Sequence, residues 1–363
     1  MKFAIVNSRV SKVILGADPW VKSTKKAFDE ITQVSDCNIL TSIELYTWEM
    51  VLFLASKKNC RVTVYVPENA KKSEVIEEFM LDEDAVDFVY VEGDYKGKNW
   101  WHKRDKAIIN DADKIYAIWV REGGNIERNI SELKAEDKIV ETYKVSNPID
   151  ETISQRYPNT LKLSELSDKV LNDSDWNYLT HWTHTSYAPW CFESKFEFYK
   201  SIINSHDVYS HNAFNSLKRI LERKIICGSS KGAREGKRFV SFTALSPLGS
   251  LRFMRWRKGL GRFYWEPYGL AITIESAFQV GLRPVNYVAK KDYDKLPETL
   301  KDFYQPLRSR RYVWAYEQEW RLPGDLDLSL VPRESMLAIV RKKGESEELR
   351  KEFGIKTLAL TED

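Results

Sequence analysis

The first 120 residues contain five short apolar runs, at residues 3–6, 37–40, 61–66, 88–91 and 114–120. Segments with the spacing of amphipathic helices separate them, at residues 22–31, 42–55, 73–80 and 99–112. Short runs that are apolar throughout are typical of strands buried on both faces, as in a parallel sheet covered by helices. The sequence therefore predicts an α/β first domain, with ligands bound at the carboxyl ends of its strands.

Small polar residues follow the first and the last of these runs. Asn7, Ser8 and Arg9 come directly after the first run, and the Gly123-Gly124-Asn125 segment follows the last. Paired glycines let a backbone approach a phosphate closely, and a helix capped by Asn125 would offer N–H groups and a positive dipole end to an anion. The plainer interpretation is a strand-to-helix turn without a ligand, and the glycine pair alone does not decide between the two.

The order of motifs before this turn adds to the phosphate interpretation. A basic stretch, Trp101-His102-Lys103-Arg104-Asp105, precedes Asn110-Asp111-Ala112-Asp113, a strand and the glycine pair. Over residues 1–145 this order resembles the SLOG superfamily, Rossmann-like proteins that include the lonely-guy nucleotide phosphoribohydrolases and the DNA-processing recombination mediators. The resemblance implies a Rossmann-like domain that binds a nucleotide phosphate through Arg104, Gly123, Gly124 and Asn125, with Ser8 and Arg9 on the neighbouring loop.

The sequence departs from the hydrolases of that superfamily at their catalytic motif. Those enzymes carry Gly-Gly-x-Gly-Thr-x-x-Glu, whereas the fourth, fifth and eighth positions here are Ile126, Glu127 and Ile130. Because the threonine and the catalytic glutamate are missing in register, we expect this half to bind a nucleotide rather than hydrolyse it. Hydrolysis of an N-glycosidic bond in this half is the disfavoured alternative.

The chain is long enough for a second domain of different composition. Its 363 residues exceed one average domain, and aromatic residues are concentrated after residue 176. Residues 146–175 hold two prolines and many Ser, Asp and Asn residues, which predicts a linker. Short strand patterns then occur together with helical segments at 196–203 and 214–221. We expect residues 176–363 to form an α+β domain with a largely antiparallel sheet.

Two closely spaced carboxylates stand out in this second domain. Glu317 and Glu319 lie with Arg321 at alternate positions of residues 314–322, so a strand would place all three on one face. Two carboxylates this close raise each other's pKa, and the arginine can hold the nearer one ionised. The plainer interpretation is a solvated strand face with a surface ion pair.

Two earlier strand patterns carry further polar side chains. His181 lies in the pattern at residues 178–184, and Ser241 and Thr243 lie in the one at residues 238–243. The series of this histidine, the Ser-Phe-Thr strand and the Glu-x-Glu-Trp-Arg motif resembles uncharacterised bacterial domains often found in defence-type genes, over residues 176–340. Through three short motifs alone it is also similar to the ADP-ribosyltransferase superfamily, in which such residues hold NAD in a cleft.

That similarity implies NAD as the cofactor and a role for each residue. Glu319 would bind the nicotinamide-ribose hydroxyl and stabilise the oxocarbenium-like state, while Glu317 would orient or activate the acceptor. His181 would position a ribose or pyrophosphate, Ser241 would support the site, and Arg321 would orient Glu319. The expected activity is ADP-ribosyl transfer or NAD glycohydrolysis coupled to a nucleotide-sensing first domain, in phage defence. The plainer interpretations are a core histidine, a surface strand face and a structural ion pair.

A basic run interleaved with aromatic residues offers an alternative function. Its cations are Arg252, Arg255, Arg257, Lys258 and Arg262. Such a run can line a groove for phosphates and bases, which would make the protein a non-catalytic nucleotide- or nucleic-acid-binding protein. A solvated amphipathic helix is the more common explanation. The net charge of only +3 implies no general affinity for nucleic acid.

The remaining features bear on cofactors and location. The four cysteines show no CxxC pairing, which argues against a zinc site and a disulfide framework and favours a reducing compartment. His181 and His184 have no obvious third partner, so no metal is expected. No apolar stretch of about 18 residues occurs, and the N-terminal apolar run is too short for a signal peptide. We therefore expect a cytoplasmic protein without a membrane partner, and a homo-oligomer stays open.

Overall fold

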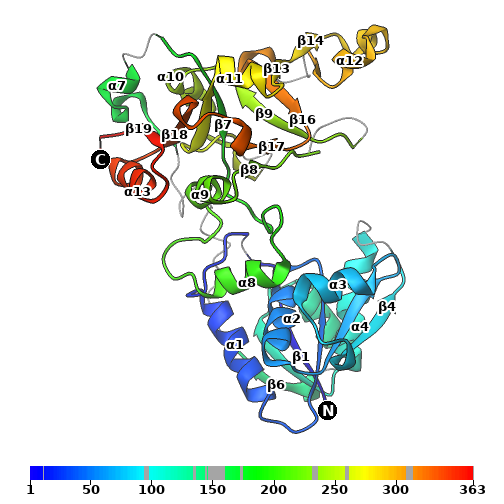
Figure 1. Ribbon diagram of the computed structural model, residues 1–363. Helices are drawn as coiled ribbons and strands as arrows, with labels where there is room; N and C mark the ends of the chain where they lie inside the picture. The colour runs from blue at the N-terminus through cyan, green and yellow to red at the C-terminus, as the bar shows by residue number, and fades with distance from the viewer. Residues whose placement is uncertain are drawn as a thin grey trace. The chain divides into compact units, whose positions relative to one another are not determined.

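The computed structural model describes residues 1–10, 12–93, 98–133, 136–143, 145, 160–171, 175–230, 236–257, 261–307 and 314–362. The chain forms two compact units (Figure 1). Unit 1 comprises Met1–Ile153 and Tyr187–Ser210, and unit 2 comprises Ser154–Ser186 and His211–Asp363. The predicted fold class is confirmed, because unit 1 contains a Rossmann-like parallel sheet with helices and unit 2 a mixed, mostly antiparallel sheet.

Unit 1 is built on a six-stranded parallel sheet in the order β4-β3-β2-β1-β5-β6. Its strands are β1 (Lys2–Asn7), β2 (Asn38–Ser42), β3 (Val62–Pro67), β4 (Val86–Val91), β5 (Lys114–Trp119) and β6 (Ile139–Thr142). Every residue of β3, and every residue of β1 after Lys2, is buried, which is why the predicted apolar runs form central strands. The chain runs outward from β1 to β4 and then returns to the other side of β1, so the strand order switches between β1 and β5.

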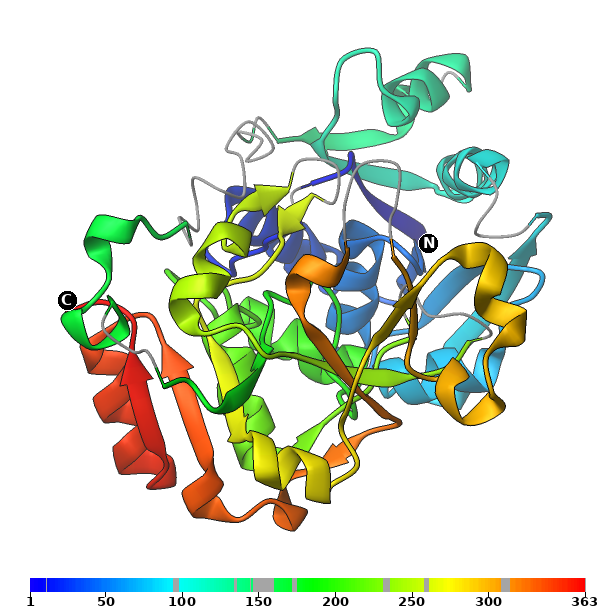
Figure 2. The ribbon, with the colours of Figure 1, turned by 90° about the horizontal axis from the view of Figure 1, so that it is seen from above.

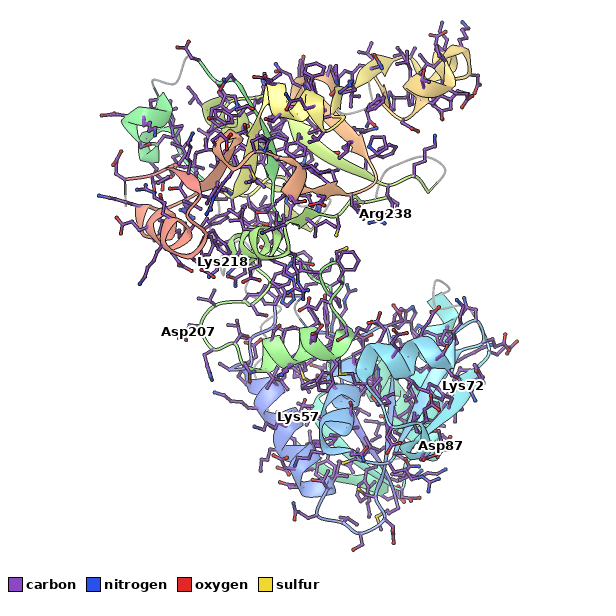
Figure 3. All side chains as sticks on the ribbon, in the orientation of Figure 1. Lys57, Lys72, Asp87, Asp207, Lys218 and Arg238 are labelled. Atoms are coloured by element: carbon purple, nitrogen blue, oxygen red, sulfur yellow. The ribbon has the colours of Figure 1, made fainter. Side chains whose placement is uncertain are left out.

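Five helices pack with this sheet. They are α1 (Pro19–Ile31), α2 (Tyr46–Lys58), α3 (Lys72–Phe79), α4 (Lys98–Asp111) and α5 (Asn125–Glu132). α2 contacts α1, α3 and the sheet, so nine consecutive residues from Thr47 to Ala55 are buried. α4 and α5 contact each other. Lys72 at the start of α3 lies over the rings of Phe88 and Tyr90 on the edge strand β4 (Figure 3).

A segment from the middle of the chain completes unit 1. The chain leaves unit 2 after Ser186 and returns to it at His211, where Ser186 N donates to His211 O at 2.9 Å. Between these points the segment contains α8 (Lys195–Ile203), which contacts α2 and α3. Sequence analysis placed this segment in the second domain, because nothing in its composition marks a return to the first.

A buried carboxylate on α2 holds α8 in place. Glu49 is 7% exposed; its Oε1 accepts from Lys195 Nζ at 2.6 Å and its Oε2 from Tyr199 OH at 2.6 Å. Glu49 Oε1 also accepts from the backbone N–H of Glu44 at 3.0 Å. All the donors come from unit 1, so this carboxylate joins the inserted helix to the N-terminal end of α2.

Unit 2 is built on a seven-stranded sheet in the order β13-β16-β9-β7-β12-β18-β19. Its strands are β7 (Tyr178–Trp182), β9 (Phe239–Thr243), β12 (Gly269–Thr273), β13 (Arg283–Pro284), β16 (Glu319–Pro323), β18 (Met336–Val340) and β19 (Lys356–Ala359). All neighbouring pairs are antiparallel except β18 and β19. This arrangement matches the largely antiparallel sheet expected from the sequence.

Smaller elements surround this sheet. The helices are α7 (Asp168–Leu171), α9 (Ala213–Arg223), α10 (Pro247–Ser250), α11 (Ile274–Gln279), α12 (Glu298–Lys301) and α13 (Lys343–Phe353). The short strands pair as β8 (Ile225–Ile226) with β17 (Leu326–Asp327), β10 (Trp256–Arg257) with β11 (Arg262–Phe263), and β14 (Asn286–Val288) with β15 (Tyr304–Pro306). Figure 2 shows α13 and β19, in red, side by side. Lys218 on α9 pairs with Glu348 and Glu352 on α13 at 2.9 and 2.7 Å (Figure 3).

The two faces of the unit 2 sheet differ in character. One face is apolar across the strands and carries Leu179, Val240, Phe242 and Leu270 into the main core. The opposite face is apolar only toward β12, β18 and β19, where Trp182 and Ile339 pack against residues of the 161–170 segment. Over β9 and β16 this second face carries polar side chains instead, and the candidate site lies there.

The alternating pattern of residues 283–288 predicts one strand, but Arg283–Pro284 pairs with β16 while Asn286–Val288 pairs with β15 in another sheet. The cysteines also differ from the expectation of a reduced set, because Cys191 and Cys227 are each disulfide-bonded, whereas Cys37 and Cys60 are free thiols.

Candidate functional site

Strand register gathers polar side chains on one face of the unit 2 sheet. Thr180 on β7 pairs with Thr243 on β9, and Thr243 pairs with Glu319 on β16. Ser241 pairs with Arg321 two residues along. Residues directly opposite each other in antiparallel strands project from the same face, so these five side chains share one surface.

The carboxylate of Glu319 is held in place by three hydrogen bonds. Its Oε1 accepts from Ser241 Oγ at 2.7 Å and from Arg321 Nε at 2.8 Å, and its Oε2 accepts from Arg321 Nη2 at 3.0 Å. The side chains of Glu319 and Arg321 are only 14% and 11% exposed. The bidentate pairing with a planar guanidinium fixes the plane of this largely buried carboxylate, and Oε2 keeps acceptor capacity for another donor.

Arg321 is itself fixed by neighbours. Its Nη1 donates to Tyr304 O at 2.9 Å and its Nη2 to Gln305 Oε1 at 2.6 Å. Its guanidinium also lies 5.4 Å from the ring centroid of Phe239. In this geometry Arg321 fixes the orientation of the Glu319 carboxylate.

A backbone kink separates the two carboxylates that sequence analysis placed on one strand face. Residues Trp314–Glu317 form a 3₁₀ turn, Gln318 has a φ of +48°, and the strand starts only at Glu319. The expectation of a single strand over 314–322 is therefore wrong. A left-handed backbone is uncommon for a residue with a Cβ, and such positions often occur at functional sites.

Glu317 reaches the same region from the turn. Its Oε1 accepts from the hydroxyl of Tyr264, which follows β11, and its backbone oxygen accepts from Thr243 Oγ1 at 2.5 Å. Glu319 N donates to the hydroxyl of Tyr287 at 3.0 Å. Burial raises the pKa of Tyr287 to about 12, so its hydroxyl stays protonated at neutral pH. The missed partners Tyr264 and Tyr287 come from loops and short strands whose placement the sequence pattern does not reveal.

His181 does not lie with these groups. It pairs with Leu270, and its ring stacks beside Phe242 at 5.6 Å between centroids, so it projects from the core face of the sheet. Its Nδ1–H donates to the backbone oxygen of Ser241 at 2.9 Å. The expectation that its side chain lines the same cleft as the Ser241 and Glu319 side chains is therefore wrong, because strand alternation puts it on the other side.

An unsatisfied hydroxyl supports a built site on the polar face. Thr180 Oγ1 is buried without a hydrogen-bond partner in the described chain, and the residue is 1% exposed. An unpaired buried hydroxyl destabilises a fold by about 1–3 kcal/mol. Thr180 lies on the same sheet face as Glu319, with Thr243 on β9 between them.

The second candidate region is the carboxyl edge of the unit 1 sheet, where the strand order switches. Ser8 N donates to Trp119 O at 2.8 Å, and Ser8 Oγ accepts from Arg121 N at 2.9 Å, which ties the ends of β1 and β5 together. Gly123 has a φ of +67° and open space where a side chain would be. At Gly124 an added Cβ would lie 2.7 Å from Arg121 O, so the turn requires glycine there.

The turn before α5 already holds a carboxylate. Glu127 Oε2 accepts from Gly123 N at 2.6 Å, and Asn125 Oδ1 accepts from Arg128 Nη2. Gly124 occupies the N-cap position, so the expectation that Asn125 caps α5 is wrong; Asn125 is the first helical residue. Glu127 thus occupies a position that an anion would take, and a phosphate would have to replace it.

The most informative residue at this edge is one to which the sequence pattern assigned a position but no role. Asn7, the last residue of β1, is 3% exposed, and neither its Nδ2 nor its Oδ1 has a partner in the described chain. Thr47 in the first turn of α2 is also 3% exposed with an unpartnered Oγ1. The signal in the sequence was an amide at the end of an otherwise apolar strand.

Arg104 lies at this edge but is buried and already paired, and its Nη1 donates at 3.3 Å to the backbone oxygen of Ile43, which directly follows β2. It is 1% exposed, and its Nε and Nη2 donate to Asp105 Oδ1 at 3.0 and 2.7 Å. Its guanidinium also lies within 5.5 Å of the rings of Trp48, Trp100 and Trp101. A buried arginine satisfied in this way stabilises α4, so the structure gives it a packing role and Arg9 alone remains as a basic residue on the expected loop.

The basic run forms a hairpin rather than a helix. Arg257 and Arg262 lie on the paired strands β10 and β11, while Arg252 precedes them in a 3₁₀ turn. Arg252 and Arg255 are exposed, and Arg257 stacks over Tyr264 at 5.1 Å. Lys258 lies outside the described residues.

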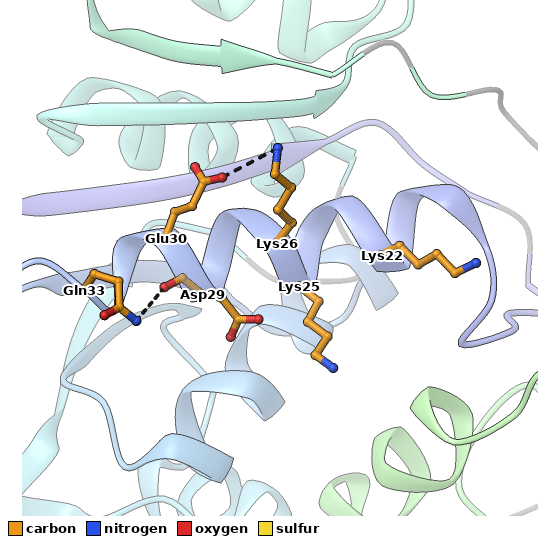
Figure 4. A pocket seen from close by; sticks show the side chains of 6 residues that line it. All are labelled: Lys22, Lys25, Lys26, Asp29, Glu30 and Gln33. Atoms are coloured by element: carbon orange, nitrogen blue, oxygen red, sulfur yellow. Dashed lines mark hydrogen bonds and ion pairs between the residues drawn. The ribbon is translucent and has the colours of Figure 1, made fainter.

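A further hollow lies along the surface of α1. It is lined by Lys22, Lys25, Lys26, Asp29, Glu30 and Gln33 (Figure 4). Lys26 and Glu30 approach to 3.7 Å and Gln33 donates to Asp29 O at 3.4 Å, so these charges are largely paired across successive turns. None of the residues predicted to bind a ligand lines it.

Comparison with known proteins does not assign the chain to a family. No protein-family model matches the chain, and no curated protein is significantly similar to it. Within the described residues no cluster of three or more potential metal ligands occurs. No helix in the described part of the chain is long and apolar enough to span a bilayer.

Proposed function

We propose that the protein is a nucleotide-responsive enzyme that uses NAD, and that unit 2 breaks the bond between the nicotinamide and its ribose. The observation that carries this proposal is the carboxylate of Glu319, immobilised by Ser241 and Arg321 on the polar part of the sheet face over β9 and β16. A fixed carboxylate with spare acceptor capacity suits a ribose hydroxyl better than it suits a free anion.

The chemistry assigns different roles to the two carboxylates. Glu319 accepts a hydrogen bond from a ribose hydroxyl and stabilises the positive charge that develops on the sugar as the N-glycosidic bond breaks. Nicotinamide leaves as a neutral molecule with the bonding electron pair. Water or an acceptor hydroxyl then adds to the anomeric carbon and releases a proton, which Glu317 takes as general base. His181 has no direct role in this scheme, because its ring lies on the other face.

Nicotinamide release from NAD tests the proposal directly. The full-length protein is assayed alone and with a panel of mono-, di- and cyclic nucleotides, and Glu319→Gln is compared with wild type. Glu275→Gln, an exposed carboxylate on α11, is the matched control. We expect release that falls at least about a hundredfold in Glu319→Gln only, as for removal of a fixed electrostatic stabiliser. Absent release under every condition, or equal release in both variants, overturns the proposal.

The sensing part of the proposal concerns the carboxyl edge of unit 1. Ligands of parallel α/β sheets bind where the strand order switches, and here that point carries the unpartnered amide of Asn7 and the Gly123-Gly124 turn. A nucleotide bound there would satisfy the amide and replace Glu127 at the turn. A rise in melting temperature on adding the nucleotide reports such binding.

The competing function is nucleic-acid binding without catalysis. The exposed Arg252 and Arg255 beside the β10–β11 hairpin favour it. It predicts affinity for DNA or RNA that falls steeply with salt, and an Arg252→Gln/Arg255→Gln double variant should lose it. Binding that stays at background at low salt eliminates this alternative.

A further inference from the structure

Arg252 is anchored to the turn that carries the carboxylates. Its Nη2 donates to Tyr316 O at 3.0 Å, and its guanidinium lies over the rings of Phe253 and Tyr316 at 4.9 and 5.7 Å. Tyr316 is 57% exposed and directly precedes Glu317. The chain from Tyr316 to Glu319 spans three residues, so their Cα atoms lie at most about 11 Å apart. A cation is thus attached to the turn that leads directly into the fixed carboxylate.

This cation keeps donors for a ligand. Arg252 is exposed, and within the described chain only its Nη2 forms a hydrogen bond. A guanidinium has five N–H donors in a fixed fork that matches the oxygens of a phosphate. Stacking on two aromatic rings restricts the orientation of that fork, so less entropy is lost when an anion binds.

An apolar groove adjoins the same arginine. It is lined by Leu163, Leu248, Gly249, Leu251 and Arg252, and has a volume of about 500 Å³. Leu163 is 58% exposed, so its apolar side chain forms an open edge of the groove. An apolar floor that ends in one exposed cation complements a flat aromatic base joined to a phosphate.

We propose that Arg252 binds the phosphate of a ribonucleotide whose ribose contacts Glu319 and whose base lies toward the groove. The inference rests on the proposed function of unit 2 and narrows its substrate to phosphorylated nucleotides such as dinucleotides. Nucleosides and nicotinamide riboside, which lack the phosphate, are poor substrates. Arg252 acts as a specificity residue, since it contacts the substrate away from the bond that breaks.

Substrate preference in matched variants tests this assignment. Nicotinamide release from NAD and from nicotinamide riboside is measured for wild type, Arg252→Gln, Arg252→Lys and the control Arg255→Gln. Arg255 is exposed nearby and its side chain makes no hydrogen bond or ion pair in the described chain. We expect wild type and Arg255→Gln to prefer NAD. Arg252→Gln should lose at least about tenfold of that preference, mainly through a higher KM, because a charge-assisted contact contributes 1.4 kcal/mol or more. Arg252→Lys should retain part of it.

A binding measurement separates this inference from the catalytic proposal. Titration calorimetry with inorganic pyrophosphate and with ADP-ribose needs no turnover, and the difference between wild type and Arg252→Gln removes any contribution from unit 1. We expect both ligands to bind more weakly to Arg252→Gln. Equal affinities in the two proteins overturn the role of Arg252, even if Glu319→Gln abolishes nicotinamide release. Weakened binding without any release instead overturns the catalytic proposal and leaves Arg252 as an anion site. Equal losses in Arg252→Gln and Arg255→Gln indicate a diffuse nucleic-acid surface and also overturn the assignment.

Discussion

Arg321 binds the carboxylate of Glu319, two residues earlier on the same strand, through two parallel hydrogen bonds. Its Nε donates to Oε1 at 2.8 Å and its Nη2 donates to Oε2 at 3.0 Å. The strand period of two puts both side chains on one face, and the planar guanidinium matches the planar carboxylate. Tyr304 O and Gln305 hold the other side of the guanidinium. The carboxylate is therefore positioned by a chain of contacts rather than by its own backbone alone.

Replacing Arg321 with lysine tests how far this geometry matters. An ammonium keeps the charge but offers one point contact instead of a fork, so the Glu319 carboxylate should keep a cationic partner and lose its fixed orientation. We expect kcat for nicotinamide release to fall about tenfold or more, with a smaller change in KM, as for a loss of 1–2 kcal/mol at the transition state. Arg255→Lys is the matched control. An unchanged kcat in Arg321→Lys would show that the pair is only structural.

Replacing Asn7 should raise the stability of the protein but abolish nucleotide binding. The Asn7 amide is buried without a partner, so Asn7→Leu, which keeps the volume and removes the polar atoms, should raise the free energy of unfolding by about 1 kcal/mol in the absence of ligand. The same variant should abolish the rise in melting temperature that a nucleotide produces in wild type.

Asn38→Leu supplies the control for this prediction. Asn38 begins β2 in the same sheet, and its Nδ2 donates to Thr63 Oγ1 at 3.0 Å, so the leucine should destabilise the fold instead. Thermal and denaturant unfolding, with and without nucleotide, measure both effects. If Asn7→Leu destabilises the protein as much as Asn38→Leu does, the Asn7 amide has a structural partner. The nucleotide site proposed for unit 1 would then be wrong.

The sequence predicted which segments form strands better than it predicted which side chains lie next to one another. The five apolar runs of unit 1 form strands, and those in β1, β2, β3 and β5 do so because a run buried on both faces has few other stable conformations, whereas β4 is a partly exposed edge strand. The pairing of Glu319 with Arg321 also followed from spacing, because both lie on one strand. His181 was misplaced because the face it occupies depends on the register between β7, β9 and β12, which local sequence does not encode.

Other errors came from long-range packing. Gln318 has a left-handed backbone but is not a glycine, so the sequence gives no sign of the kink there. The predicted strand therefore began too early in the chain. Arg104 looked like a surface cation, but three tryptophans and Asp105 enclose it. An exposed arginine and a buried one have the same local sequence signature, and only tertiary contacts distinguish them.

The buried carboxylate of Glu49 predicts strong coupling between α2 and α8. Lys195→Met removes the ammonium that lies 2.6 Å from Glu49 Oε1 and leaves a 7%-exposed charge with fewer partners. We expect the free energy of unfolding of unit 1 to fall by about 2–4 kcal/mol. Adding Glu49→Gln should recover part of this loss, because the uncompensated charge is gone, and the double-mutant cycle measures the coupling. Lys200→Met, one turn along α8 and exposed, is the control. Additive effects would show that the two side chains do not interact.

His181 predicts a pH dependence of stability with a defined sign. Burial of the ring lowers the pKa of His181 below its usual 6.5, and the hydrogen bond to Ser241 O opposes this shift only in part. The unfolded chain then binds a proton more readily than the folded one, so this histidine's contribution to stability is present above pH 6.5 and is lost as the pH falls through the folded pKa. Denaturant unfolding between pH 8 and pH 5 should therefore show a steeper loss in wild type than in His181→Gln, whose side chain can still donate to Ser241 O but does not titrate. His206→Gln, an exposed histidine, should leave the slope unchanged. Parallel curves for wild type and His181→Gln would mean that the ring titrates normally and is open to water. His181 would then be available to bind a ligand.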